Sequence, residues 1–304
     1  METSSQRTFV CRADGTRIDR LLCDLYEDIS RTYARRLLDE GRVLIGGSPA
    51  KPSDKPTLGD RVTVSMPPLV PMHAIAQDIP LSILYEDSYL LVVDKPKGMV
   101  VHPAAGHSDG TLVNALLAHC GDNLSDLNGV VRPGIVHRID KDTSGLLLVV
   151  KDNRVHELVS ERIRRHDFLR VYDAIVLGTV KEETGSITAP IGRDPRDRKR
   201  MAVVSEGKPA RTTFRTLERL DGATRIEATL ETGRTHQIRV HMAYIGHPVL
   251  GDPLYGGVRK NLELHGQALH ARRLGFEHPV DGRYLEFESE PPAEFFSILE
   301  KLRP

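Results

Sequence analysis

The chain has few cysteines and no excess of either charge. Its 304 residues include three cysteines, Cys11, Cys23 and Cys120, which are far apart and form no C-x-x-C pair. This spacing argues against a disulfide framework or a thiolate metal site and is typical of a reducing compartment. Lys+Arg and Asp+Glu are equal at 42 each, so any basic surface for nucleic acid must come from local clustering.

Long apolar runs and common cofactor motifs are also missing. No stretch approaches the roughly 18–20 apolar residues of a membrane span, and the first nine residues lack a signal-peptide core. We therefore expect a cytoplasmic protein without a membrane partner, and a monomer, because no large apolar interface stripe is visible. The sequence has no phosphate-binding loop, no dinucleotide fingerprint, no G-x-S-x-G and no H-E-x-x-H. We expect neither cofactor nor metal.

The N-terminal part predicts a small module of two helices followed by strands. Residues 17–28 carry four apolar side chains at helical spacing, Ile18, Leu21, Leu22 and Leu25. A second helix is expected between Ser30, as its N-cap, and Gly41, and strands at 43–45 and 61–66. The exposed side of the second helix carries Arg31, Arg35 and Arg36. This basic side is either ordinary solvated surface or a contact for structured RNA.

A dense group of prolines separates this module from the rest of the chain. Pro67, Pro68, Pro71 and Pro80 fall too close together for a helix or a central strand. We therefore divide the chain into a module at 1–66, a linker at 67–80 and a large domain at 81–304.

The large domain contains a polar crossing that leads into an apolar run. The stretch GIVHRIDKDTSGLLLVVK, residues 134–151, places His137, Arg138 and Asp140 before the block 146–150, which predicts a strand buried on both faces. Asp140 then lies at the edge of a core. The alternative is that Asp140 caps a solvated turn, since turns favour aspartate.

Two later stretches carry further candidate residues. The segment 230–246 predicts a helix with Thr235 as its N-cap, and Arg239 lies one position off its buried stripe of Ile238, Met242 and Ile245. Residues 193–200 carry five basic side chains in eight positions between strand-like segments, among them Arg198, Lys199 and Arg200. This loop or hairpin tip either serves solubility or contacts phosphates.

Four colinear stretches together resemble the RluA-type pseudouridine synthases. They are VRPGIVHRIDKDTSGLLLVVK, FLRVYDAIVLG, RKRMAVVSEGKPARTTFRTLE and LETGRTHQIRVHMAYIGHPVLGDPLYGG, and the first module resembles the S4 RNA-binding domain. The resemblance implies an α+β fold: a catalytic domain on a central mixed or antiparallel sheet, plus a small S4-like α/β module. It also implies isomerisation of uridine to pseudouridine in structured RNA, with large-subunit ribosomal RNA as the expected substrate and no cofactor.

The resemblance assigns roles that suit the chemistry. Breaking the N1–C1′ bond of uridine develops positive charge on the sugar, which a carboxylate can stabilise or trap. Asp140 would be that carboxylate; attack on C1′, addition to the base and removal of a ribose proton all suit it. Arg239 would pair with Asp140 and orient it. Tyr172 would stack on the uracil and present its hydroxyl near C5, although a core tyrosine is the simpler interpretation.

The target base must leave its helix to turn, and unstacking costs a few kcal/mol. The resemblance makes Arg138 and His137 RNA- or base-binding residues, with Arg138 filling the space of the extruded base. Two other functions fit the sequence: an RNA-binding ribosome assembly factor without activity, and a nucleoside hydrolase that frees uracil.

Overall fold

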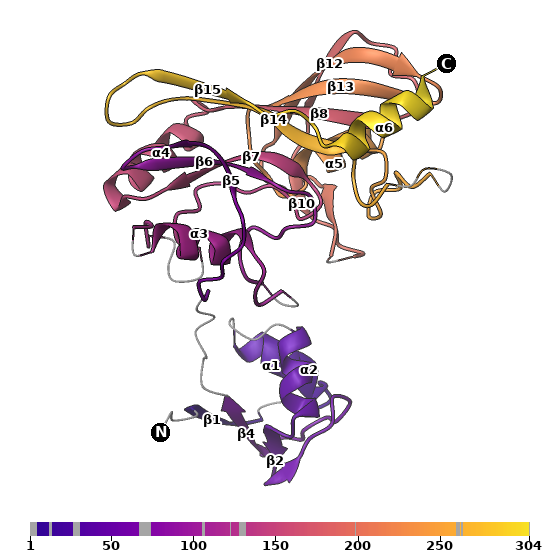
Figure 1. Ribbon diagram of the computed structural model, residues 1–304. Helices are drawn as coiled ribbons and strands as arrows, with labels where there is room; N and C mark the ends of the chain where they lie inside the picture. Colours follow the sequence, from indigo (N-terminus) through magenta and orange to yellow (C-terminus); the bar gives the residue numbers. More distant parts are fainter. Residues whose placement is uncertain are drawn as a thin grey trace. The chain divides into compact units, whose positions relative to one another are not determined.

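The computed structural model divides the chain into two compact units, residues 1–71 and 72–304 (Figure 1). The structure describes residues 5–11, 14–26, 31–66, 74–104, 107–121, 123–127, 132–197, 199–259, 262 and 264–303. Ser30, Arg198 and the first three linker prolines therefore lie outside the described residues, and so does the side chain of Arg31.

The first unit packs two helices against one sheet. Its strands are β1 (Ser5–Val10), β2 (Val43–Ile45), β3 (Ser48–Pro49) and β4 (Arg61–Met66), and its helices are α1 (Ile18–Leu25) and α2 (Arg31–Asp39). The order is β1-β4-β2-β3, with every pair antiparallel. The apolar faces of both helices meet Val62 and Val64 of β4 in one core, because each apolar stripe must be buried.

The second unit is built on a nine-stranded mixed sheet, as predicted. Its strands are β5 (Ser82–Glu86), β6 (Leu90–Lys95), β7 (Ser144–Val150), β8 (Leu169–Leu177), β9 (Thr184–Thr188), β12 (Arg211–Leu220), β13 (Ala223–Leu230), β14 (Leu269–Glu277) and β15 (Tyr284–Glu288). The order is β5-β6-β7-β14-β8-β13-β12-β9, with β15 on β14. All pairs are antiparallel except β7 with β14.

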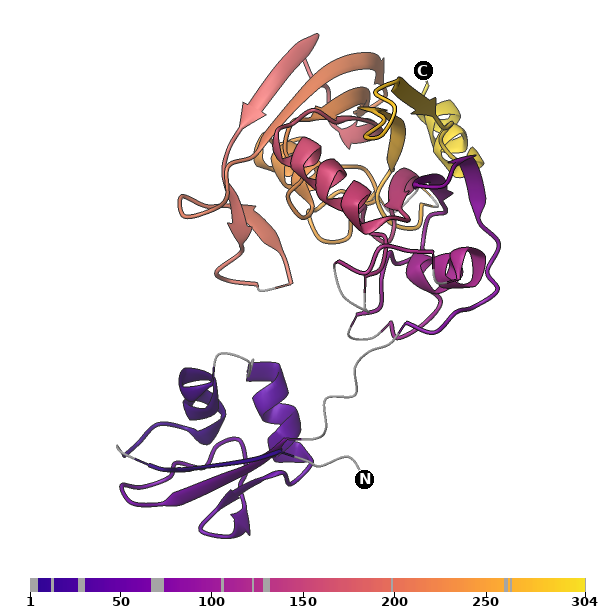
Figure 2. The ribbon, with the colours of Figure 1, turned by 90° about the vertical axis from the view of Figure 1, so that its left-hand side faces the viewer.

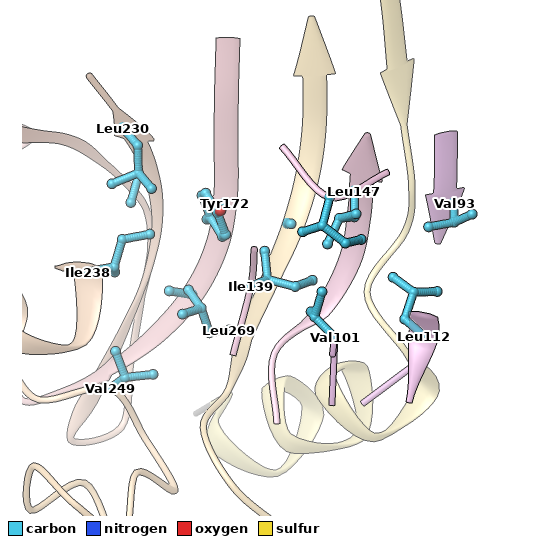
Figure 3. Packing of buried hydrophobic residues seen from close by; sticks show 14 of the residues in the cluster. Val93, Val101, Leu112, Ile139, Leu147, Tyr172, Leu230, Ile238, Val249 and Leu269 are labelled. Carbon is cyan, nitrogen blue, oxygen red and sulfur yellow. The ribbon is translucent and has the colours of Figure 1, made fainter. Parts of the chain in front are cut away.

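Alternation along the strands gives the sheet two apolar faces. One face packs against α3 (Leu112–Cys120) and α5 (Gln237–Tyr244), the other against α4 (Asn153–Arg164) and α6 (Ala293–Leu302). The strand β7 is buried along its whole length, which confirms the sequence prediction. Figure 3 shows Leu147, Leu269 and Tyr172, from β7, β14 and β8, on the face of α3 and α5.

The parallel contact between β7 and β14 is short and close. It pairs Ser144 with His270 and Gly145 with Ala271. A Cβ at Gly145 would lie 2.3 Å from the carbonyl oxygen of Ala271. Only glycine therefore allows the two backbones to approach here, at the start of the strand that follows Asp140.

The end of the expected linker belongs to the second unit. The amide of Gln77 donates to the carbonyl of Asn114 at 2.9 Å, and the side-chain amide of Asn114 donates to the carbonyl of Ile75 at 2.8 Å. This segment is therefore anchored to α3.

The basic stretch 193–200 lies at the end of a hairpin. Its strands are β10 (Ile191–Arg193) and β11 (Met201–Val203), which form a two-stranded antiparallel sheet (Figure 2). Within the described residues, no helix is long and apolar enough to cross a bilayer.

Candidate active site

Asp140 lies on the polar crossing that precedes β7, and neighbouring groups hold this crossing in place. The amide of Leu148 donates to Nε2 of His137 at 2.9 Å. The buried ammonium of Lys95 donates to the carbonyls of Pro96, Met99 and Lys141, at 2.8, 2.9 and 3.1 Å. The backbone on both sides of Asp140 is thus fixed by hydrogen bonds to β7 and to the end of β6.

The carboxylate of Asp140 belongs to a chain of three charged groups. Arg239 on α5, its expected partner, donates from Nη1 to Oδ2 of Asp140 at 2.8 Å. The same guanidinium donates from Nε and Nη2 to the two oxygens of Asp252, at 2.7 and 3.0 Å. Burial alone would lower the pKa of Arg239, but the bonds and charges of Asp252 and Asp140 raise it above its ordinary value. Arg239 is therefore held as a cation.

Helix α5 begins differently from the sequence prediction. Its N-cap is His236, which has a left-handed φ of 57° and no capping side-chain bond, so the prediction of Thr235 was wrong. Ile245, expected in the buried stripe, is 37% exposed because it follows the last helical turn as the C-cap. A left-handed non-glycine residue is strained and marks a candidate functional position. Nε2 of His236 lies 3.8 Å from Oδ1 of Asp140.

Tyr255 packs against Arg239 and His236. Its hydroxyl shares a hydrogen bond with Nδ1 of His236 at 2.9 Å and accepts one from the amide of Met201, at 3.0 Å. The guanidinium carbons of Arg239 and Arg200 each lie 5.2 Å from the centre of its ring. Arg200 thus ties the β10–β11 hairpin to the residues around Asp140 through a cation–π contact.

Tyr172 lines the same cleft from β8. Its ring is 6% exposed and packs in the core cluster beneath the site. Burial raises the pKa of Tyr172 to about 12, so its side chain is a neutral phenol at neutral pH.

Asp140, Tyr172, His236 and Arg239 line one cleft of about 420 Å³. The cleft brings together five predicted residues: Asp140, Tyr172, Arg239, His137 and Arg138. Arg138 is exposed, whereas His137 is half-buried beside Phe168. Lys199 is exposed on the hairpin, outside the residues that line the cleft.

The remaining basic candidates lie in the first unit. Arg35 and Arg36 are exposed on α2, and each has a carboxylate one helical turn ahead, Asp39 at 3.8 Å and Glu40 at 2.7 Å.

Sequence reasoning missed Asp252, Tyr255 and His236. The first two lie in the turn after α5, whose sequence GDPLYGG belongs to a stretch quoted for the resemblance but received no role. The glycine at 257 was the feature of the sequence that could have indicated a tightly built turn. In the structure, a Cβ there would lie 1.7 Å from the carbonyl oxygen of Val249. A turn this tightly built holds its polar side chains in fixed directions.

Comparisons with known proteins agree with this fold. The RNA pseudouridylate synthase family matches residues 89–244, and the S4 domain matches residues 16–62. The chain is 51% identical over 287 residues to "Uncharacterized RNA pseudouridine synthase YlyB" of Bacillus subtilis, covering 94% of each chain. It is 46% identical over 299 residues to "Ribosomal large subunit pseudouridine synthase D" of Zymomonas mobilis, covering 95% of this chain and 94% of that relative.

A solved structure, "Human RNA Pseudouridylate Synthase Domain Containing 1", superposes with a TM-score of 0.57 at 27% identity, covering 71% of this chain and 86% of that one. The family match, the full-length relatives and the shared fold agree: this chain belongs to the RluA family of RNA pseudouridine synthases, which are isomerases, and it carries an S4 RNA-binding domain in its first unit.

Proposed function

We propose that the protein isomerises specific uridines in large-subunit ribosomal RNA, with Asp140 as the catalytic carboxylate. The observation that carries this proposal is the position of Asp140: its side chain is 17% exposed, faces the cleft and is held by a buried arginine. Relatives named for the large ribosomal subunit, 46% and 42% identical to this chain, support the choice of RNA.

The reaction needs only what these residues supply. The N1–C1′ bond breaks, the uracil turns, C5 bonds to C1′, the C5 hydrogen leaves as a proton and N1 gains one. Asp140 meets the positive charge that develops at C1′. Arg239 keeps that carboxylate in one direction, since Asp252 takes its other two nitrogens.

Tyr172 forms the wall on which the uracil stacks, and its hydroxyl lies where the C5 hydrogen leaves. Because its phenol is neutral in the free enzyme, it acts first as a hydrogen-bond donor to the base. Arg138, exposed at the cleft, occupies the place of the extruded base. The S4 domain and its basic α2 select the RNA, so they influence target choice more than chemistry.

The test is release of tritium from C5-labelled uridine in ribosomal RNA by wild type and Asp140→Ala. We expect release by wild type and a fall of at least about 10³-fold in the variant, as removal of an essential catalytic group produces. Release by both proteins would overturn the role of Asp140. RNA binding without release by wild type would favour an assembly factor, and free uracil among the products would identify a hydrolase.

A further inference from the structure

Arg170 is a buried cation beside the site. It lies two residues before Tyr172 on β8, so both side chains point to the same face of the sheet. The residue is 5% exposed and lines the cleft. Its Nη2 reaches the carbonyl of Glu231 at a long 3.4 Å, and its Nε is buried with no hydrogen-bond partner.

No carboxylate compensates this charge in the described part of the chain. Arg170 takes part in none of its ion pairs, and the ring of Phe168 lies 5.8 Å from the guanidinium carbon. Burial lowers the pKa of Arg170, and the positive charge of Arg234 lowers it further.

Arg234 also lines the cleft and lacks an ion-pair partner among the described residues. Its Nε donates to the carbonyl of Pro209 at 2.9 Å, which leaves its terminal nitrogens available. The loop 232–234 is held by Gln237. The side-chain oxygen of Gln237 accepts from the amide of Arg234 at 2.9 Å and from the hydroxyl of Thr232 at 2.7 Å. The backbone at Arg234 is therefore held in place beside the cleft that both arginines line.

The backbone at position 233 leaves no room for a side chain next to Arg170. A Cβ at Gly233 would lie 2.6 Å from Nη1 of Arg170. Glycine at this position therefore keeps the terminal nitrogens of Arg170 open toward the cleft.

Such an arrangement is costly in the free protein. A buried charge without a partner loses the solvation it has in water, and buried charges are normally paired. The missing partner must be an anion that enters the cleft with the substrate.

We propose that Arg170 and Arg234 form a binding site for one backbone phosphate of the RNA, next to the uridine that enters the cleft. This inference rests on the proposed function, whose site it extends. The planar guanidinium suits phosphate, because it presents two parallel donors to two oxygens. The site would anchor the sugar–phosphate on one side of the target base, while Tyr172 contacts the base itself.

The test is the salt dependence of RNA binding, measured with a large-subunit ribosomal RNA transcript. Arg170→Met and Arg234→Met should each bind about 10- to 100-fold more weakly, as loss of a charged hydrogen bond predicts. Each should also reduce the slope of log affinity against log salt, by up to about 0.7 to 0.9, the share of the one phosphate that both arginines bind. Arg170→Met should melt no lower than wild type, because an apolar side chain replaces an uncompensated charge.

The control is Arg303→Met, which removes an exposed arginine that pairs with Glu218 and should keep the wild-type slope. An unchanged slope in both cleft variants would overturn the proposal. A lower kcat in Arg170→Met with an unchanged slope would also overturn it, since Arg170 would then act through Tyr172. If Arg170→Met does not fold, the less buried Arg234→Met decides alone.

Binding is read without turnover, so the two proposals can fail separately. Tritium release by wild type from the same transcript tests the substrate. The salt slope tests the phosphate site.

Discussion

Asp252 takes two of the three nitrogens of the Arg239 guanidinium, at 2.7 and 3.0 Å, and is itself fully buried. Its Oδ1 also accepts the backbone amides of Leu254 and Tyr255. The carboxylate is thus saturated and cannot turn. The direction in which Nη1 of Arg239 points, and hence the place of the Asp140 carboxylate, is set by a residue that does not line the cleft.

Asp252→Asn should therefore lose both stability and activity. Its amide nitrogen would face the guanidinium as a second donor and leave a buried charge incompletely paired. We expect a loss of about 3 kcal/mol in the free energy of unfolding in urea, and at least about a tenfold lower single-turnover rate.

The matched control is Asp281→Asn, which breaks the exposed ion pair with Arg283 and should change neither quantity. A wild-type rate in Asp252→Asn would show that Asp140 does not depend on the direction of Arg239.

Tyr172→Phe separates the ring from its hydroxyl. No described residue exchanges a hydrogen bond with this hydroxyl, so the variant should fold and bind RNA like wild type. If the hydroxyl moves a proton at C5, tritium release should fall by about 10²- to 10⁴-fold, the usual share of an acid–base group. Normal release would leave only stacking to Tyr172, which Tyr172→Ala would then abolish.

Acid should weaken the second unit through two of its histidines, half-buried His137 and buried His102. Burial lowers the pKa of His137 to about 3, with a smaller effect of Arg170, and lowers that of His102 to about 4. The ordinary value is 6.5, so between pH 6.5 and these values the unfolded chain binds more protons. Stability falls as pH falls through this window, by up to about 1.4 kcal/mol per pH unit for each histidine.

Urea midpoints measured between pH 7.5 and 4.5 check this expectation. In His137→Gln the amide oxygen can still accept a hydrogen bond from the amide of Leu148. The fall of the unfolding free energy with falling pH should be smaller by the contribution of one histidine. His265→Asn, on an exposed position, should keep the wild-type slope; an equal slope in His137→Gln would contradict the prediction.

The basic side of α2 should contribute to RNA binding and not to chemistry. The double variant Arg35→Gln/Arg36→Gln should weaken binding to the ribosomal transcript. It should also reduce the slope of log affinity against log salt by at most the share of about two phosphate contacts, because Asp39 and Glu40 already neutralise part of the charge of the two arginines. At saturating RNA the turnover rate should stay the same. Arg20→Gln/Arg61→Gln removes the same net charge from exposed positions on α1 and β4. Equal losses in both double variants would mean that only net charge matters.

The sequence predicted elements whose pattern is local. The run at 146–150 is buried on both faces, so its unbroken apolar character already defined β7. The apolar spacing of Ile18 and Leu22 likewise predicted α1. The predicted start of α5 was wrong. Thr235 is a residue type that often caps helices, but the N-cap is His236, whose side chain contacts Tyr255 and Asp140.

The pairing of Asp140 with Arg239 was predicted from the family resemblance and not from a local pattern. Asp140 and Arg239 are 99 positions apart and meet only because β14 and β8 follow β7 in the sheet. Asp252 lies behind Arg239, so no pattern near it distinguishes it from a turn aspartate. No local pattern distinguishes Arg170, because its lack of an ion-pair partner among the described residues is a property of three-dimensional packing.

The close contact at Gly145 also has a consequence for the order of synthesis. The strand that separates β7 from β8 is β14, which the ribosome makes more than a hundred residues after Asp140. A nascent chain that has not yet emerged to Glu277 therefore lacks the strand that sets Asp140 and Tyr172 at their distance across the sheet. The S4 domain, complete after Met66, can hold RNA much earlier, whereas the isomerase site forms only when nearly the whole chain has been translated.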